Sequence, residues 1–106
     1  MSALYQISFY VPASHCEQVK QALFDAGAGK LEAYDCCSWQ TLGQGQFKPL
    51  EGSHPFLGTN DTLETVDEYK VEIMCSEAHL HNAMQALKSS HPYEVPAYAV
   101  IKLEGY

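Results

Sequence analysis

The sequence predicts an α+β fold in which four antiparallel strands form one sheet and two helices cover one of its faces. Apolar residues alternate in several short segments, which is typical of half-buried strands, and recur at helical spacing in two segments between them. The resulting order is strand, helix, strand, strand, helix, strand, the split β-α-β arrangement called ferredoxin-like. The length of 106 residues predicts a single domain over residues 1–106.

The first half of this arrangement is expected within the first forty or so residues. Residues 4–11 alternate and predict the first strand. Residues 14–26 predict a helix with Ser14 as its N-cap, and Gly27 is expected to end it because glycine adopts the left-handed backbone that closes a helix. Residues 31–41 are expected to form the second strand.

The second half begins with a long irregular segment, expected over residues 42–63. So long a loop is uncommon in a small domain, and such loops often carry function. Residues 65–75 alternate and predict the third strand. Ser76 is expected to cap a second helix with an apolar face, and residues 95–103 predict the last strand.

Charge and hydropathy exclude several classes of function. Six basic and thirteen acidic residues give a net charge of -7. Binding to nucleic acid or to an anionic membrane needs a basic surface, so neither partner is expected. No apolar run approaches the roughly 20 residues that span a bilayer. The N-terminus has no basic start and no long apolar run, so a cytoplasmic location with reduced cysteines is expected.

The predicted sheet has a second face that the two helices leave open. In a monomer that face is expected to be polar. Here it is predicted to be half apolar, which favours burial against another copy of the chain over scattered surface hydrophobes. The apolar residues expected on this face are Leu4, Tyr10, Met74, Tyr98 and Val100.

The glycine pair Gly43 and Gly45 invites comparison with phosphate-binding loops. The dinucleotide-binding pattern would need a glycine where Lys48 stands and a helix that opens there. Pro49 follows instead, and the residues after it show no helical periodicity. Turn geometry is therefore the favoured role for the glycines. Anion binding by Lys48 beside backbone N–H groups is the alternative.

The histidines and cysteines form no local pattern of a catalytic or metal site. No nucleophile is joined to a base by spacing, so the sequence predicts neither an enzyme nor a cofactor. His54 and His91 lie in predicted loops and are the weak candidates for metal ligands. The favoured role of the segment from His91 to Glu94 is structural: it ends the second helix, Tyr93 packs against the sheet edge, and Glu94 accepts hydrogen bonds from backbone N–H groups.

Two stretches of the chain resemble a known family. The first combines Gly27-Ala28-Gly29, residues 34–38, the run 43–58 with its Gly-x-Gly-x-Phe-x-Pro and Gly-Ser-x-Pro-Phe patterns, and residues 63–68. It looks like the domain inserted in bacterial Nif-three-like (YqfO-type) proteins. The second is His-Pro-Tyr-Glu-Val-Pro-Ala-Tyr at residues 91–98, which resembles the end of the same insert and a segment of the CutA divalent-cation-tolerance proteins. Together the resemblance covers residues 4–103.

The resemblance implies a CutA-like and, more distantly, PII-like domain of ferredoxin-like fold. Such domains typically form trimers by packing their helix-free sheet faces around a central axis. The longer Nif-three-like proteins carry a paired metal site in flanking α/β portions, and the chain is expected to be the insert standing alone. Neither that metal site nor a hydrolase-like activity is therefore carried over.

The expected function is that of a small homotrimeric CutA/PII-like module that binds a small ligand or a partner protein in a cleft between subunits. The residues expected in the cleft are Phe47, Lys48, Glu51, His54, Phe56, His91, Tyr93 and Glu94. An equally favoured alternative is that Phe47 and Phe56 pack into the hydrophobic core of their own subunit. The alternatives are a copper- or zinc-binding protein of CutA type and a non-catalytic subunit that works with a separate Nif-three-like protein.

Overall fold

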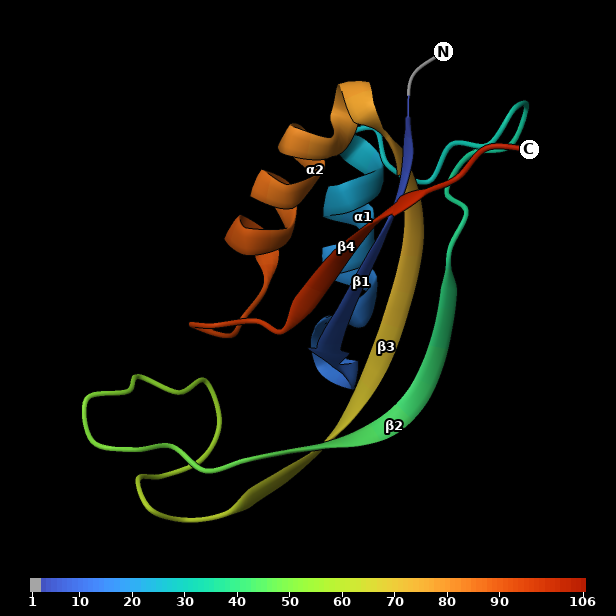
Figure 1. Ribbon diagram of the computed structural model, residues 1–106. Helices are drawn as coiled ribbons and strands as arrows, with labels where there is room; N and C mark the ends of the chain where they lie inside the picture. The colour runs from blue at the N-terminus through green and yellow to red at the C-terminus, as the bar shows by residue number, and fades with distance from the viewer. Residues whose placement is uncertain (1–2) are drawn as a thin grey trace.

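The computed structural model describes residues 3–106 and confirms the ferredoxin-like α+β architecture. Four antiparallel strands form one sheet in the order β2-β3-β1-β4, and both helices pack on the same face of it (Figure 1). The elements in chain order are β1 (Leu4–Pro12), a 3-10 turn (Ala13–His15), α1 (Cys16–Asp25), β2 (Trp39–Phe47), β3 (Glu64–Ser76), α2 (Glu77–Ser90) and β4 (Tyr98–Leu103).

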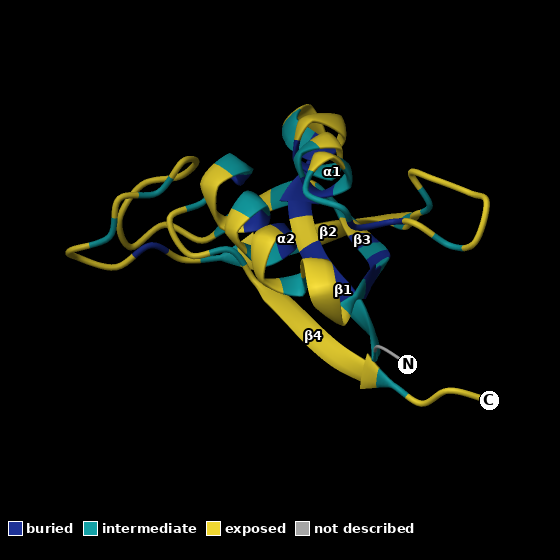
Figure 2. Ribbon diagram, turned by 90° about the horizontal axis from the view of Figure 1, so that it is seen from above, coloured by how far each residue is buried: buried dark blue, intermediate teal, exposed yellow. Residues whose placement is uncertain are grey.

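The core lies between the helices and the two central strands. Alternate residues of β1 and β3 point into it, and Phe9 and Ile7 are the largest of the fully buried side chains. Val19 and Leu23 of α1 and Leu87 of α2 close the core from the other side. Figure 2 shows buried residues in both helices and in the central strands beneath them. Burying each such side chain stabilises the fold by roughly 1.5–3 kcal/mol.

The end of α1 is built as the sequence predicts. Gly27 has a φ of 104°, which an L side chain rarely adopts. Its N–H donates to the carbonyl of Phe24 at 3.0 Å, and the N–H of Ala28 donates to the carbonyl of Leu23 at 3.0 Å. This pair of hydrogen bonds is a Schellman motif, and it satisfies carbonyls that the helix itself leaves free.

The start of α1 differs from the prediction. Ser14 lies inside the 3-10 turn, and α1 begins at Cys16 with His15 as its N-cap. The Ser14 hydroxyl is within 2.8 Å of His15 Nδ1 instead of reaching a backbone N–H. Ser76 does occupy the N-cap of α2, as expected, although its side chain makes no capping bond there.

The second strand is the largest correction to the predicted elements. The prediction placed it at residues 31–41 and a loop at 42–63, whereas β2 is Trp39–Phe47 and the loop spans residues 48–63. Glu32 and Cys36 have φ values of 52° and 56°, which a strand does not allow. Strand periodicity missed the true β2 because Gly43 and Gly45 lie inside it, where glycine weakens the strand signal.

The faces of β4 are reversed relative to the prediction. Tyr98 pairs with Phe9 and Val100 with Ile7, both core residues of β1, so Tyr98 and Val100 point to the helix side. Lys88 of α2 confirms this, because its Nζ lies 5.6 Å from the centre of the Tyr98 ring. The placement of Tyr98 and Val100 on the helix-free face was therefore wrong. A register error of one position moves every side chain of a strand to the other face.

The molecule is elongated, with principal extents of 48 × 24 × 24 Å. The connection over residues 31–38 lies at the end of the sheet that also holds the C-terminus, and the loop over residues 48–63 lies at the opposite end (Figure 1). Within residues 3–106, neither helix is long and apolar enough to cross a membrane.

Candidate functional site

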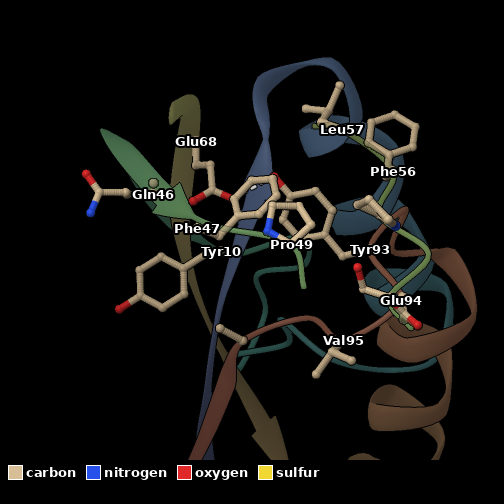
Figure 3. A pocket seen from close by; sticks show the side chains of 14 residues that line it. Tyr10, Gln46, Phe47, Pro49, Phe56, Leu57, Glu68, Tyr93, Glu94 and Val95 are labelled. Carbon is tan, nitrogen blue, oxygen red and sulfur yellow. Dashed lines mark hydrogen bonds between the residues drawn. The ribbon is translucent and has the colours of Figure 1, made fainter. Parts of the chain in front are cut away.

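A cavity of about 370 Å³ lies at the end of the sheet, where the loop over residues 48–63 meets the end of β1 and the segment between α2 and β4. Figure 3 shows its side chains converging from β1, β2, β3 and both connecting segments. Its aromatic lining residues are Tyr10, Phe47, Phe56 and Tyr93, and its charged ones are Glu68 and Glu94. The cavity is large enough for a small organic molecule, since ligand sites run from roughly 300 to 1,000 Å³.

Tyr93 is the centre of the aromatic wall. Its ring centroid lies 6.3 Å from those of both Phe47 and Phe56. Its hydroxyl donates to Glu68 Oε2 at 2.8 Å, which joins the α2–β4 segment to β3. Burial of the hydroxyl and the adjacent Glu68 carboxylate raise the pKa of Tyr93, so the phenol stays protonated.

Gly45 makes room for this hydrogen bond. A Cβ at position 45 would overlap with the carboxylate of Glu68, while a Cβ at Gly43 would meet nothing within 4 Å. The glycines were expected to serve turn geometry, but both lie within β2. Gly45 instead permits the close approach of a carboxylate to the strand backbone.

His91 is held in place by both of its ring nitrogens. Nε2 lies 2.6 Å from the carbonyl oxygen of Tyr10, and Nδ1 lies 3.0 Å from the backbone nitrogen of Tyr93. These partners require the neutral tautomer with the proton on Nε2, which donates to Tyr10 while Nδ1 accepts from Tyr93. Burial lowers the pKa of His91, against smaller opposing effects of the Tyr10 carbonyl and Glu68. His91 thus positions the segment that carries Tyr93.

Glu94 ties the loop to the same segment. Its Oε2 accepts a hydrogen bond from the backbone N–H of His54 at 2.9 Å, across forty positions of the sequence. The expectation that Glu94 accepts from a backbone N–H is confirmed. The loop also contacts the 3-10 turn, because the rings of Phe56 and His15 meet edge-on with centroids 5.1 Å apart.

The structure gathers half of the residues expected in the cleft. Phe47, Phe56, Tyr93 and Glu94 line the cavity. His91 lies behind Tyr93, and the remaining residues Lys48, Glu51 and His54 are exposed on the loop and do not line it. Phe47 and Phe56 are absent from the buried core, and Phe56 is 45% exposed, so they are walls of the cavity and not plugs of the core.

Sequence reasoning missed Glu68 as a site residue. It stands in an acidic stretch of the third strand, and such a stretch ordinarily forms a solvated strand edge. Glu68 pairs with Gly43 in the sheet, and its carboxylate lies diagonally against Gly45, the next residue of β2 on the same face. This missing side chain at Gly45 is a local signal, but the register of β2 is needed to recognise it. Tyr10 was expected on the helix-free face and also lines the cavity.

The metal candidates do not converge. Within the described part of the chain, no group of three or more His, Cys, Asp or Glu side chains is placed to hold a metal ion. The ring nitrogens of His91 are occupied by backbone partners, and His54 is exposed on the loop.

The helix-free face of the sheet carries large apolar side chains. Leu4 and Met74 lie on it by their register on β1 and β3, as expected. Ile101 of β4 pairs with Gln6 and also lies on it, 52% exposed. Trp39 of β2 pairs with Glu72 on the same face and is 68% exposed. Sequence reasoning missed Ile101 and Trp39 because it assigned the wrong face to β4 and the wrong position to β2.

Curated relatives of the chain share one description. No protein-family model matches it. It is 42% identical over 101 residues to a "GTP cyclohydrolase 1 type 2 homolog" of Halalkalibacterium halodurans, which covers 95% of this chain and 27% of that protein. A protein of the same description from Bacillus subtilis is 39% identical over 101 residues, with the same coverage. The chain thus spans about a quarter of the length of the curated relatives it matches.

Solved structures add the fold relationship. A Bacillus cereus protein related to NIF3 matches with a TM-score of 0.83 and 33% identity, over 98% of this chain and 26% of that one. CutA from Synechococcus elongatus matches with a TM-score of 0.67 and 20% identity, over 97% of this chain and 79% of that one. The chain is a CutA-like domain of the Nif-three-like family. At 20% identity, the match to CutA shows that this CutA-like domain shares its fold.

Proposed function

We propose that this CutA-like domain is a binding or regulatory module that assembles as a homotrimer through the helix-free face of its sheet and holds a ligand in the cavity at the end of that sheet. The observation that carries the proposal is the set of exposed apolar side chains on the open face. A cytoplasmic setting, in which the cysteines stay reduced, belongs to the same proposal; all four are free in the structure.

The open face supports self-association by its composition. Trp39 and Ile101 are more than half exposed there, and Leu4 and Met74 are half-buried on the central strands between them. Aromatic residues and methionine are enriched in protein interfaces, and tryptophan is among the residues that contribute most to binding there. Polar residues on the face are already partnered in part, because Gln6 Nε2 donates to Glu72 Oε2 at 2.8 Å.

Tyr10 connects the face to the cavity. It pairs with Lys70 on the open face of β1 and β3, it is 41% exposed, and it also lines the cavity. A neighbouring subunit that covers the open face would therefore border the cavity at Tyr10. This supports a ligand site that lies at a subunit boundary, so that assembly and binding affect each other.

Two substitutions on β4 test the assembly. Ile101→Asp places a charge on the open face, whereas Tyr98→Asp places the same charge on the helix side of the same strand. Burying an unpaired charge costs several kcal/mol, so Ile101→Asp is expected to dissociate the trimer and Tyr98→Asp to leave it intact. Size-exclusion chromatography with light scattering measures both. Equal masses for the wild type and Ile101→Asp would contradict the proposal.

A second candidate is a non-catalytic role beside Nif-three-like portions. The specific observation is that the chain matches 27% of the length of a curated relative, at 42% identity. In this case the domain binds separately supplied flanking portions of such a relative. Calorimetric titration of the purified domain with those portions tests this role, and absence of binding would remove it.

A further inference from the structure

We propose that the cavity selects a small organic cation, namely a primary or quaternary amine attached to an apolar or aromatic body. This inference rests on the proposed function and names the chemical class of its ligand. It follows from three properties of the lining: its aromatic rings, its carboxylates and its lack of cationic groups.

The rings provide faces that attract a cation. Tyr93 stands between Phe47 and Phe56, with both centroid distances at 6.3 Å, and Tyr10 adds a fourth ring from β1 (Figure 3). An ammonium group within about 6 Å of an aromatic centroid is attracted by the negative face of the ring. Several rings around one cavity act together in this way and bury the apolar part of the ligand as well.

The carboxylates supply charge of the matching sign. Glu68 is half-buried and Glu94 is exposed at the cavity. One oxygen of each is already used: Glu68 Oε2 accepts from Tyr93 and Glu94 Oε2 accepts from His54. The second oxygen of each carboxylate takes no part in these bonds. It can accept from the N–H groups of a primary ammonium, and it attracts a quaternary ammonium, which has no N–H, by charge alone.

No cationic side chain competes for the carboxylates. Among residues 3–106, the lining of the cavity includes no Lys, Arg or His, and neither Glu68 nor Glu94 forms an ion pair. Two histidines contact the aromatic wall from outside the lining. His91 is engaged with backbone partners as the neutral imidazole, and His15 meets Phe56 edge-on. The two carboxylates give the lining a negative charge, which favours a cation over an anion or a neutral molecule of the same shape.

Three probes of similar size separate charge from shape. Phenethylamine is a cation at neutral pH, 2-phenylethanol is neutral and phenylacetate is an anion. Titration calorimetry on the intact assembled protein is expected to show saturable binding of the amine, about tenfold weaker binding of the alcohol and no binding of the acid. Equal or tighter binding of the alcohol or the acid would overturn the choice of a cation and leave the cavity as a binding site.

Matched variants test which residues of the cavity determine the affinity for the amine. Glu68→Gln is expected to weaken binding of the amine about tenfold and to leave binding of the alcohol unchanged. Asp67→Asn makes the same charge change at the neighbouring position of the same strand, outside the cavity and off the open face, so it is expected to alter neither. Phe56→Leu removes a ring that is 45% exposed and lies outside the buried core, and it is expected to weaken binding of the amine about threefold.

The outcomes also separate this inference from the proposed function. If none of the probes binds while light scattering shows the assembled protein, both the cation and the cavity as a ligand site are overturned, and only the assembly stands. Identical amine affinity in the wild type and in Glu68→Gln would overturn the electrostatic basis of the selection.

Discussion

The two faces of the sheet carry apolar side chains of similar size in different surroundings. On the helix side, Phe9 and Ile7 are completely enclosed. On the other side, Trp39 and Ile101 are more than half exposed, and β4, which carries Ile101, is exposed along most of its length (Figure 2). The first set is explained by the folded chain alone, since α1 and α2 cover it. The second set has no cover within the described residues, so we infer that its role lies in contacts with another molecule.

The largest expected effect is a difference in the free energy of unfolding between variants at an enclosed residue and at a partly exposed one. Phe9 and Tyr98 are directly paired aromatic residues on the helix side, one enclosed and one 43% exposed. Phe9→Ala is expected to lower the free energy of unfolding by about 3–5 kcal/mol because it leaves a cavity in the core. Tyr98→Ala is expected to lower it by less than about 1 kcal/mol. Urea unfolding measures both losses. Similar values would contradict the distinction between the enclosed core at Phe9 and the partly exposed surface at Tyr98.

An intermediate effect is expected at the cavity. Gly45→Ala would push the Glu68 carboxylate away from the Tyr93 hydroxyl, whereas Gly43→Ala has free space around it. Gly45→Ala is therefore expected to cost about 1 kcal/mol of stability through the lost hydrogen bond. Gly43→Ala is expected to cost less. Thermal unfolding of the two variants side by side checks this, and a greater loss in Gly43→Ala would refute the role assigned to Gly45.

A spectroscopic effect is expected on the open face. Trp39 is the single tryptophan of the chain, so its fluorescence reports on one site. If a second copy covers that face, its emission is expected to shift to shorter wavelength as concentration rises into the assembly range. The same titration of Ile101→Asp is expected to stay at the wavelength of an exposed indole. Emission of the wild type that stays at the wavelength of an exposed indole at every concentration would show that Trp39 lies outside the contact.

The smallest effect concerns pH. Burial holds the pKa of His91 below its ordinary value of 6.5 in the folded state, so the unfolded chain takes up this proton first as pH falls. The stability that depends on neutral His91 is fully present above 6.5 and is lost as pH decreases below it. The wild type is therefore expected to lose stability more steeply than His91→Gln on mild acidification. Parallel curves from urea unfolding at a series of pH values would contradict this.

The sequence predicted the core faces of β1, β3 and the helices and the C-terminal end of α1, because these depend on local periodicity and on glycine chemistry. Gly27 closes α1 as expected for a residue with positive φ. The position of β2 could not be predicted, since its glycines hide the strand pattern and its pairing with β3 is non-local. The register of β4 also depends on pairing, and the alternation at Ala99 and Ile101 fits either face.

The candidate site was predicted only in part, because local signals place some of its residues and strand pairing places the others. Tyr93 and Glu94 follow a proline that ends a helix, and this local signal placed them at the sheet edge. Glu68 and Tyr10 reach the cavity only through the sheet register. Two of the cleft residues expected on the loop, Lys48 and Glu51, are exposed and do not line the cavity, because nothing local decides how a long loop folds back.

The most direct test of the account is the mass of the wild-type protein in solution. A single chain has a mass of 11.8 kDa. Sedimentation equilibrium at micromolar concentration is predicted to give three times that mass, with the open faces of three subunits in contact. A mass of 11.8 kDa at every concentration would contradict the account, because the exposed apolar face would then be a surface without a partner copy.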